Sequence, residues 1–437
     1  MPSLSHPSLA ALPARLCSTA VPLLVALGLI VAPARAQAGT RPLLITVDDL
    51  PISAGRLHPD PEERLAVTRG MLAALKSHHI QAVGLVTWRN VRDETDLRLL
   101  SLWLEAGHEL GNHSWGHLDY SATAADAFLA DIERAREALA GFLDARGKPL
   151  RFFRFPFLRE GNDRAKLDAA RGYLERTGQR NLPVTIDNQD WSFERPWVEA
   201  AGDEAARQWV AEDYHAALRI AVRHHEGRGD RLFDRPLPQI LLLHATAIGA
   251  AQWDRLFTWL EDAGHRFAGA DEVLADPVFD QPHDFVGPKG FGLWDRLAVA
   301  IDAGNAREAI ERVLERQAAA WSRGDLEAFC ASYAEDAFYV SPTGEARGRE
   351  ALAARYRARY PDASAMGDLR FEIVEFRPAA GYEVSLLGDA VPGSIHGVSV
   401  MARWTLSDPG RADATGMTLL VFHPGPTGWQ IVHDASF

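Results

Sequence analysis

The chain has 437 residues, of which 47% are hydrophobic, and it carries a formal charge of −13 at pH 7. That length is sufficient for two or more domains, each with its own core. The acidic charge argues against nucleic acid and anionic lipid as partners, because both are negatively charged, and it favours neutral or cationic partners.

The first 36 residues have the features of a secretory signal peptide. One early base, Arg15, precedes an apolar stretch over residues 21–31, and small residues follow at Ala34 and Ala36. The apolar stretch is short for a spanning helix, which needs about 20 residues, so an uncleaved anchor is the weaker alternative. We predict cleavage after Ala36, a periplasmic or secreted protein, and no stable membrane insertion after cleavage. The mature chain would keep only Cys330 and form no internal disulfide.

Short β-rich runs alternate with longer amphipathic stretches from residue 41 to about residue 276. This alternation predicts an α/β fold with a parallel sheet or a barrel. In such folds the chemistry gathers at the carboxyl ends of the strands. The predicted strands cover residues 43–47, 82–87, 152–155, 184–187 and 240–244, and the predicted helices cover residues 62–78, 96–106, 124–145 and 204–225.

Residues 276–294 are rich in proline, glycine and aromatic side chains, but they are too apolar for a free linker. We predict that they form an arm packed on the first domain, with the domain boundary near Asp302. The first domain would then cover residues 37–302, and the second domain residues 303–437.

The pattern changes after Asn305. Helical stretches come first, over residues 306–322, 326–333 and 349–360, and alternating strands follow over residues 371–377, 395–406, 417–423 and 429–433. Helices followed by a run of antiparallel-looking strands predict an α+β domain.

Two neighbouring acids, Asp48 and Asp49, stand at the end of the first predicted strand, and His113 and His117 follow later with i, i+4 spacing. If that segment is helical, both rings lie on one face and can reach one ion. One aspartate oxygen makes a third ligand and leaves positions open for water and substrate, as a hydrolytic centre needs. The second aspartate is then free to act as a base. The two acids can share one site only where the backbone turns, and Leu50-Pro51 supplies an end to the strand.

Five short stretches are spread over the first domain. They are Thr46-Val47-Asp48-Asp49, His113-Ser-Trp-Gly-His117, Arg154-Phe-Pro156-Phe157, Asp187-Asn-Gln-Asp190-Trp191 and Leu242-Leu243-His244. In this order and spacing they resemble the polysaccharide deacetylase family with the NodB homology domain, also called carbohydrate esterase family 4. The resemblance covers roughly residues 41–298 and implies a distorted (β/α) barrel in which Asp49, His113 and His117 bind the metal.

The resemblance also implies the roles of the catalytic residues. Asp48 matches the base that takes a proton from a metal-bound water as this water attacks an acetyl carbonyl, and Arg154 matches the residue that pairs with the base. The backbone N–H of Phe157 matches a donor to the oxyanion. His244 matches the general acid that protonates the leaving amine or alcohol, and Asp190 matches the acid that orients this histidine.

Further residues of the first domain have weaker assignments. Asp187 has a weaker claim to a catalytic role than Asp190. Two histidine pairs, at residues 78–79 and 224–225, lie on predicted helices with neighbouring rings facing different ways. We therefore predict that they are surface histidines rather than a second metal site. Three residues match positions that line the substrate groove or the acetyl pocket: Trp191, Trp115 and Leu243.

Four stretches of the second domain resemble the SnoaL-like (NTF2-like) domains: Trp321-Ser-Arg-Gly-Asp325, Tyr333-Ala-Glu-Asp336, Gly344-Glu-Ala-Arg347-Gly348 and Gly428-Trp429-Gln-Ile-Val-His433-Asp434. The resemblance implies a curved antiparallel sheet wrapped by helices into a cone. Because this fold serves enzymes, ligand sites and dimerisation units alike, we expect only that the domain binds a ligand or forms a homodimer. The candidate polar residues lining the cone are Tyr339, His396, His433 and Asp434.

Together these features predict an exported, metal-dependent hydrolase that removes N- or O-linked acetyl groups from a carbohydrate. The same centre also suits an amidohydrolase that acts on a small non-peptide C–N bond. A non-catalytic carbohydrate-binding or scaffold protein is a third alternative, but the presence of both a base and an acid argues against it. An Asp-His-His ligand set suits zinc, the ion we expect, as well as cobalt or nickel.

Overall fold

The computed structural model describes residues 40–360, 362, 365–384, 390–407 and 412–437. The predicted signal peptide lies outside these residues. No helix within the described part of the chain is both long enough and apolar enough to cross a membrane.

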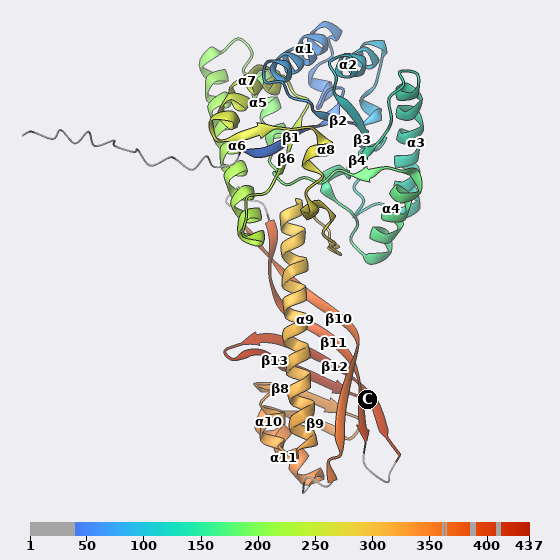
Figure 1. The fold of residues 1–437 in the computed structure, drawn as a ribbon, viewed down its shortest axis with the longest axis vertical. Helices are drawn as coiled ribbons and strands as arrows, with labels where there is room; N and C mark the ends of the chain where they lie inside the picture. Colours follow the sequence, from blue (N-terminus) through green and yellow to red (C-terminus); the bar gives the residue numbers. More distant parts are fainter. Residues whose placement is uncertain (1–39, 361, 363–364, 385–389, 408–411) are drawn as a thin grey trace, which may run out of the picture. The chain divides into compact units, whose positions relative to one another are not determined.

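Seven strands form the sheet of the first domain, and every pairing between them is parallel. Their order is β5-β4-β3-β2-β1-β6, of which Figure 1 labels β4, β3, β2, β1 and β6. Strand β7 pairs with the start of β1. The predicted strand over residues 184–187 is absent, because only Ile186 bridges to Leu241 of β6. The strands are β1 (Arg41–Leu50), β2 (Val83–Val86), β3 (Glu109–Asn112), β4 (Phe152–Phe153), β5 (Arg180–Asn181), β6 (Gln239–His244) and β7 (His265–Phe267).

The helices between these strands start where short polar side chains can cap them. Asp60, Asp93, Asp163, Asp203 and Thr246 each accept a hydrogen bond from a backbone N–H in the first turn of the helix that follows. The helices are α1 (Pro61–Ser77), α2 (Glu94–Glu105), α3 (Ala125–Asp144), α4 (Arg164–Thr177), α5 (Glu194–Glu199), α6 (Glu204–Phe233), α7 (Ala247–Asp262) and α8 (Ala270–Val273).

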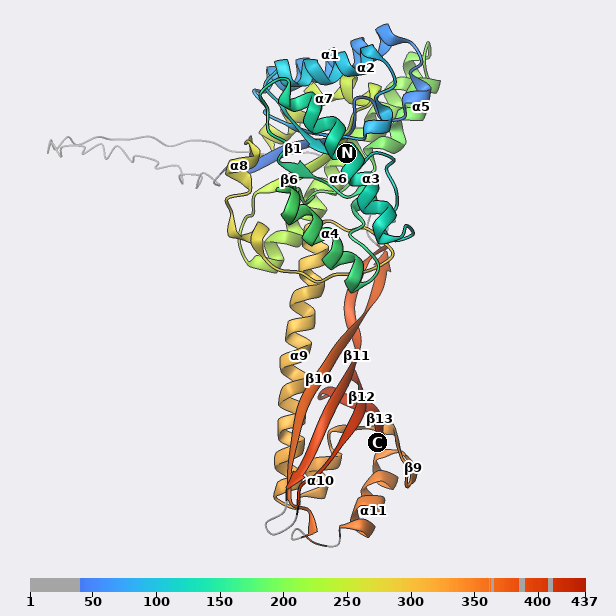
Figure 2. The same cartoon turned by 90° about the vertical axis from the view of Figure 1, so that its right-hand side faces the viewer.

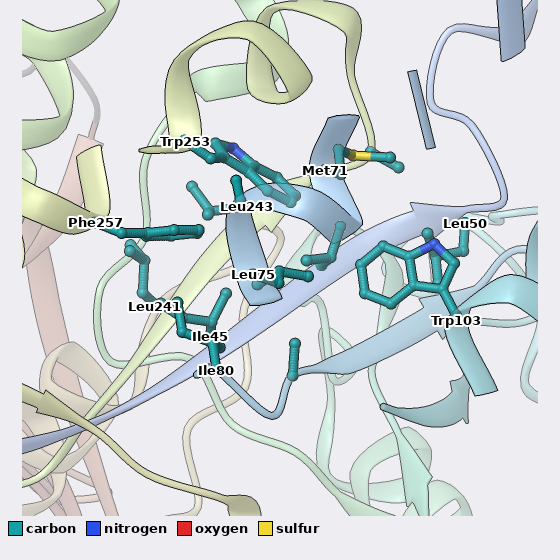
Figure 3. Packing of buried hydrophobic residues seen from close by; sticks show 14 of the residues in the cluster. Ile45, Leu50, Met71, Leu75, Ile80, Trp103, Leu241, Leu243, Trp253 and Phe257 are labelled. Carbon is teal, nitrogen blue, oxygen red and sulfur yellow. The ribbon is translucent and has the colours of Figure 1, made fainter. Parts of the chain in front are cut away.

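The largest core of the first domain lies between the central strands and the helices that cover them. Ile45 of β1 and Leu241 and Leu243 of β6 pack with Trp253 and Phe257 of α7 (Figure 3). The central strands read as nearly continuous apolar runs because a parallel sheet is covered on both faces. This core fixes β1 and β6 side by side, with Asp48 directly opposite His244.

Helix α9 (Leu293–Ser322) contributes to two cores. Its first turns bring Leu293, Trp294 and Leu297 into a cluster with Leu237 and Val278 of the first domain. Its later turns belong to the core of the second domain, in which α9 packs against β10 and β11 (Figure 2). The helix therefore begins at Leu293 rather than at residue 306, and it runs through the predicted domain boundary.

The segment over residues 276–294 contacts other parts of the first domain. The backbone N–H of Leu293 donates to Val184 O at 2.6 Å, and that of Gly287 donates to Gly161 O at 3.1 Å. Gly290 passes so close to the chain that a Cβ on it would lie 1.8 Å from Phe157 O. Glycine is required there by the close approach of two backbones.

The second domain has a six-stranded sheet in the order β10-β11-β12-β13-β8-β9. All pairings are antiparallel except that of β13 with β8. Strand β8 replaces the end of a predicted helix and was not anticipated from the sequence. The remaining elements are α10 (Leu326–Cys330), β8 (Tyr333–Ser341), β9 (Gly344–Arg347), α11 (Arg349–Arg359), β10 (Asp368–Val384), β11 (Ala390–Ser407), β12 (Ala414–Gly425) and β13 (Gly428–Ser436).

Candidate metal centre and active site

A cavity of about 580 Å³ lies at the carboxyl ends of the strands of the first domain. Strands β1, β3, β4 and β6 end beside it, because the strands are parallel and their carboxyl ends share one edge of the sheet. Several of the predicted site residues line it, and others that were not predicted join them. The lining includes Asp48, Asp49, His113, His117, Phe157, Asp187, Trp191, His224, His225, Leu242, His244 and Asp295.

Asp48 and Asp49 both face this cavity because β1 contains an irregularity. The register of β1 with β2 shifts between Val47 and Leu50, and Asp49 has a φ of 63°. A left-handed residue inside a strand redirects its side chain, so neighbouring acids need not point to opposite faces. The expected turn is therefore present, but it lies at Asp49 within the strand rather than at the strand end before Pro51.

The two histidines come from a loop rather than from a helix. The segment after β3 is irregular, and Ser114 and His117 have φ values of 68° and 53°. Asp131 of α3 holds the loop by accepting hydrogen bonds from the backbone N–H groups of Trp115 and Gly116. The ring centroids of His113 and His117 are 5.0 Å apart. The loop therefore brings the two rings together, as a helix was expected to do.

Asp49, His113 and His117 can hold a metal ion. One potential ligand atom from each residue lies within 4.8 Å of the other two. His113 Nδ1 donates to the carbonyl of Arg154 at 2.9 Å, which leaves Nε2 for an ion. Burial raises the pKa of Asp49, but His117, His113 and the hydrogen bond from Thr87 outweigh it and lower the pKa to about 2. Burial lowers the pKa of His117 to about 4. Asp49 and His117 are therefore deprotonated at neutral pH, as binding of a cation requires.

Arg154 fixes Asp48 in the floor of the site. Its Nη1 donates to Asp48 Oδ1 at 2.6 Å and to Thr46 Oγ1 at 2.9 Å. Its Nε donates to the Leu182 carbonyl at 3.1 Å. Arg154 and Asp48 are 1% and 2% exposed, so the pair is shielded from water. A charge-assisted hydrogen bond in such a setting fixes the orientation of the carboxylate.

Asp190 holds His244 in the same way on the other side of the cavity. Asp190 Oδ1 lies 2.6 Å from His244 Nδ1, and its Oδ2 accepts from the His244 backbone N–H at 2.8 Å. Burial lowers the pKa of His244, but the charge and hydrogen bond of Asp190, together with Asp49 and Asp48, raise it to about 9. His244 is therefore protonated at neutral pH, with Nε2 as its remaining donor.

The residues predicted to contact substrate divide into two groups. Phe157 and Trp191 line the cavity and are about half exposed, and the Phe157 ring lies 4.5 Å from that of His117. Trp115 does not line the cavity, because its ring packs under the Arg134 guanidinium. Leu243 is buried in the core, and Leu242 lines the cavity in its place. The alternation of side chains along β6 accounts for this correction.

Some lining residues of the first domain escaped the sequence interpretation or were assigned otherwise. His224 and His225 line the cavity, and His225 is buried, so this pair is not on the surface as predicted. Asp295 of α9 lines the same wall. The histidine doublet was visible in the sequence, but only the packing of α6 reveals which cavity it faces.

The comparisons with known proteins identify the families of the two domains. Residues 35–175 match the sequence model of the polysaccharide deacetylase family, and residues 314–425 match that of the SnoaL-like domains. The chain carries a polysaccharide deacetylase domain and a SnoaL-like domain. The recognition from sequence is therefore confirmed, as are the distorted NodB-type (β/α) barrel and the C-terminal α+β domain of NTF2-like type. A search of curated proteins found no match.

Solved structures similar to the chain come from both families. A family 4 carbohydrate esterase from Streptomyces lividans, in complex with acetate, is 20% identical, with 53% of this chain and 94% of that chain covered and a TM-score of 0.35. A family 4 pseudoenzyme from Bacillus anthracis is 18% identical, with 54% and 66% covered and a TM-score of 0.38. An NTF-2-like protein of unknown function from Shewanella oneidensis MR-1 is 27% identical, with 30% and 97% covered and a TM-score of 0.25.

The SnoaL-like domain has a smaller cavity of about 150 Å³. Asp434 lines it and accepts hydrogen bonds from Tyr333 at 2.7 Å and from Thr418 at 2.6 Å, and burial raises the pKa of this carboxyl. Tyr339 also lines the cavity as predicted. His396 and His433 are exposed and lie outside the lining, because alternation along β11 and β13 turns them outward.

Proposed function

We propose that the protein is an exported, metal-dependent deacetylase that removes acetyl groups from an extracytoplasmic carbohydrate. One observation carries this proposal: Asp48, paired with buried Arg154, and His244, paired with buried Asp190, line the same cavity as the candidate metal ligands. A base, an acid and a cation site together support hydrolysis of an acyl bond. The match to the deacetylase family supports the choice of the acetyl group.

Each residue of the site has a distinct task in this proposal. Asp49, His113 and His117 would hold a divalent ion, with zinc expected and cobalt or nickel as alternatives. When bound, the ion would supply Lewis acidity to the attacking water and to the acetyl oxygen. Asp48 takes the proton from the water, and His244 Nε2 gives a proton to the leaving group. The backbone N–H of Phe157 is the proposed protein donor to the developing oxyanion.

The protonated state of His244 favours an N-linked acetyl group. An amine leaves an acyl centre only with a proton, and the Asp190 contact keeps that proton available at neutral pH by raising the pKa of His244 to about 9. We therefore propose N-acetylated sugars as the preferred substrates, ahead of O-acetylated ones. Acetate release from a panel of both types tests this order, and faster release from the O-acetylated members would reverse it.

The ligand assignment predicts that His113→Ala loses most of its bound metal. Two donors remain after the change, and a site of two donors binds a divalent ion far more weakly than a site of three. The measurement is metal content by elemental analysis after dialysis against a zinc buffer. His79→Ala is the matched control, because His79 is exposed and lies outside the cavity. Equal metal content in both variants would remove His113 from the ligand set.

The Asp190–His244 contact predicts the alkaline limb of the pH profile. Activity should fall as the pH rises through about 9, where His244 loses the proton that it must donate. The variant Asp190→Asn removes the negative charge that raises the pKa of His244, while burial still lowers this pKa. The pKa of His244 should therefore fall, and the alkaline limb of the kcat/KM profile should move to lower pH. An unmoved limb would exclude His244 as the titrating acid.

The amidohydrolase alternative predicts different products. If small amides rather than glycans are the substrates, the metal-loaded protein should release ammonia or formate from them and no acetate from any acetylated glycan. The scaffold alternative predicts glycan binding without turnover.

For the SnoaL-like domain, we propose that it binds a ligand or forms a homodimer. Its cavity favours the ligand, because Asp434 and several aromatic rings line it. Sedimentation of the full chain measures its oligomeric state and so tests for a homodimer. A monomer at all concentrations would exclude the homodimer.

A further inference from the structure

The turn that carries the proposed oxyanion donor has an unfavourable backbone conformation. It spans Pro156–Leu158 after β4, and the φ values of Phe157 and Leu158 are 56° and 54°. Consecutive residues other than glycine rarely adopt a positive φ, and they keep it only where the surrounding structure holds them. The direction of the Phe157 N–H therefore depends on the groups that contact this turn.

Arg296 of α9 binds the end of the turn. Its Nη2 donates to the Leu158 carbonyl at 2.5 Å, and its Nη1 pairs with the carboxylate of Glu160. Glu160 also accepts from the side-chain amide of Asn181 at 2.8 Å. Arg296 is 7% exposed and does not line the cavity of the candidate metal centre, so it contacts the turn rather than a substrate in that cavity.

Two hydrogen-bonded peptide groups connect Arg296 to the Phe157 N–H. The Leu158 carbonyl, which accepts from Arg296, shares a peptide group with the Arg159 N–H. That N–H donates to the Pro156 carbonyl at 3.1 Å, and this carbonyl shares a peptide group with the Phe157 N–H. Hydrogen bonds in such a chain orient and polarise one another, and the guanidinium at its start is charged at neutral pH. The charge of Arg296 therefore favours donation by the Phe157 N–H.

The segment before α9 confines the same turn. A Cβ on Gly290 would lie 1.8 Å from Phe157 O and 2.7 Å from the carbonyl carbon of Leu158. Because these atoms belong to the backbone, they cannot move aside as the end of a flexible side chain could. Gly290 and Arg296 both lie outside residues 35–175, which match the sequence model of the deacetylase family. A part of this chain beyond the matched segment therefore holds the turn.

We propose that Arg296 is a positioning residue for the oxyanion donor, because it orients and polarises the Phe157 N–H through the peptide groups of the turn. The inference rests on the proposed function and adds a residue of α9 to the deacetylase site. Negative charge on the acetyl oxygen develops only in the transition state, so the interaction with this N–H acts on kcat rather than on KM. Gly290 supports the same turn from the segment before α9.

The test replaces Arg296 without leaving a buried charge unpaired. Glu160 is 9% exposed, so Arg296→Met is combined with Glu160→Gln. For the full, zinc-loaded chain and the N-acetylglucosamine trimer, kcat should fall about 100-fold with KM little changed, as when an oxyanion donor is misplaced. Glu160→Gln alone keeps the Arg296 contact with Leu158 and should lose far less. Arg312→Met is the matched control and should keep its kcat, because Arg312 is an exposed residue of the same helix, 3.6 Å from Glu308.

Gly290→Ala tests the second support of the turn. The added Cβ must displace the backbone of Phe157, so kcat should fall here as well. Gly304→Ala in α9 is its control, because nothing lies within 4 Å of a Cβ at that position.

Hydrogen exchange of the Arg159 amide tests the positioning independently of activity. In the double variant its hydrogen bond to the Pro156 carbonyl should open more often, and exchange should be about tenfold faster or more. The amide of Leu242 in β6 donates to Ile186 O at 3.2 Å and reports the sheet, so its exchange should match that of the wild type.

The outcomes separate this inference from the proposed function. The inference is overturned if the double variant keeps its kcat, if Arg312→Met loses as much, if the loss is confined to KM, or if the Arg159 and Leu242 amides accelerate alike. If the wild-type protein releases no acetate from any acetylated glycan, the deacetylase proposal fails. Faster exchange of the Arg159 amide in the double variant would then still support the hold of Arg296 on the turn, and unchanged exchange would overturn it.

Discussion

Replacing Asp48 by asparagine is expected to lower kcat by about 100- to 10,000-fold, the usual contribution of a general base. The amide has nearly the same shape as the carboxylate but cannot take a proton from the attacking water. It can still accept from Arg154, whose Nη1 lies 2.6 Å from Asp48 Oδ1, so the fold should persist. The measurement is the rate of acetate release at saturating substrate by the metal-loaded variant.

The variant Asp49→Asn should also lose activity, but because it binds the metal ion more weakly. Asp49 belongs to the candidate ligand set and Asp48 does not, so Asp48→Asn should keep its metal and Asp49→Asn should lose much of it. Measuring metal content in both variants tests this division of labour between neighbouring acids. If Asp48→Asn kept a kcat within about tenfold of the wild type, the assignment of the base would be wrong.

Arg154→Met is expected to destabilise the first domain by about 3–5 kcal/mol, the typical cost of removing one partner of a buried ion pair. Asp48 is 2% exposed, and the variant leaves its charge without a counterion in the floor of the site. The Leu182 carbonyl also loses the donor that Arg154 Nε supplies. Urea unfolding of the full chain, followed through the transition of the first domain, measures the effect.

Arg151→Met is the matched control for this prediction. Arg151 lies three positions earlier, and its side chain is 36% exposed beside Asp271, which is 82% exposed. Ion pairs that are open to water contribute about 0–1 kcal/mol, so the same change should cost little there. Similar losses in the two variants would show that burial of the Arg154–Asp48 pair has no special effect.

Several residues of the candidate site could be brought together from the sequence because they follow strands that are recognisable by their apolar runs. Residues 43–47 and 240–244 were both predicted as strands, and pairing of the two places Asp48 opposite His244. The carboxyl-end rule for parallel strands then brings Arg154 and His113 to the same edge. To place these four residues at one edge of the sheet, it is enough to know the order of the strands and which polar residue stands at or after the end of each strand.

The remaining features depend on backbone detail that side-chain patterns do not encode. Neither the left-handed conformation of Asp49 nor the loop that carries His117 has a periodic signal. The choice of Leu242 over Leu243 depends on which face of β6 meets the cavity, and the resemblance alone gave the other residue. The burial of His225 follows from tertiary packing of α6, which extends to Phe233 rather than ending at residue 225.

The most direct test of the central claim is the product analysis of a single reaction. Chelator-stripped protein is reloaded with zinc and incubated with the N-acetylglucosamine trimer, and acetate and free amine are measured together. The account predicts that both products appear in equal amounts, only after reloading, and at a rate that Asp48→Asn reduces by about 100-fold or more. Absence of acetate from the reloaded wild-type protein, with ammonia or formate released from small amides instead, would contradict it.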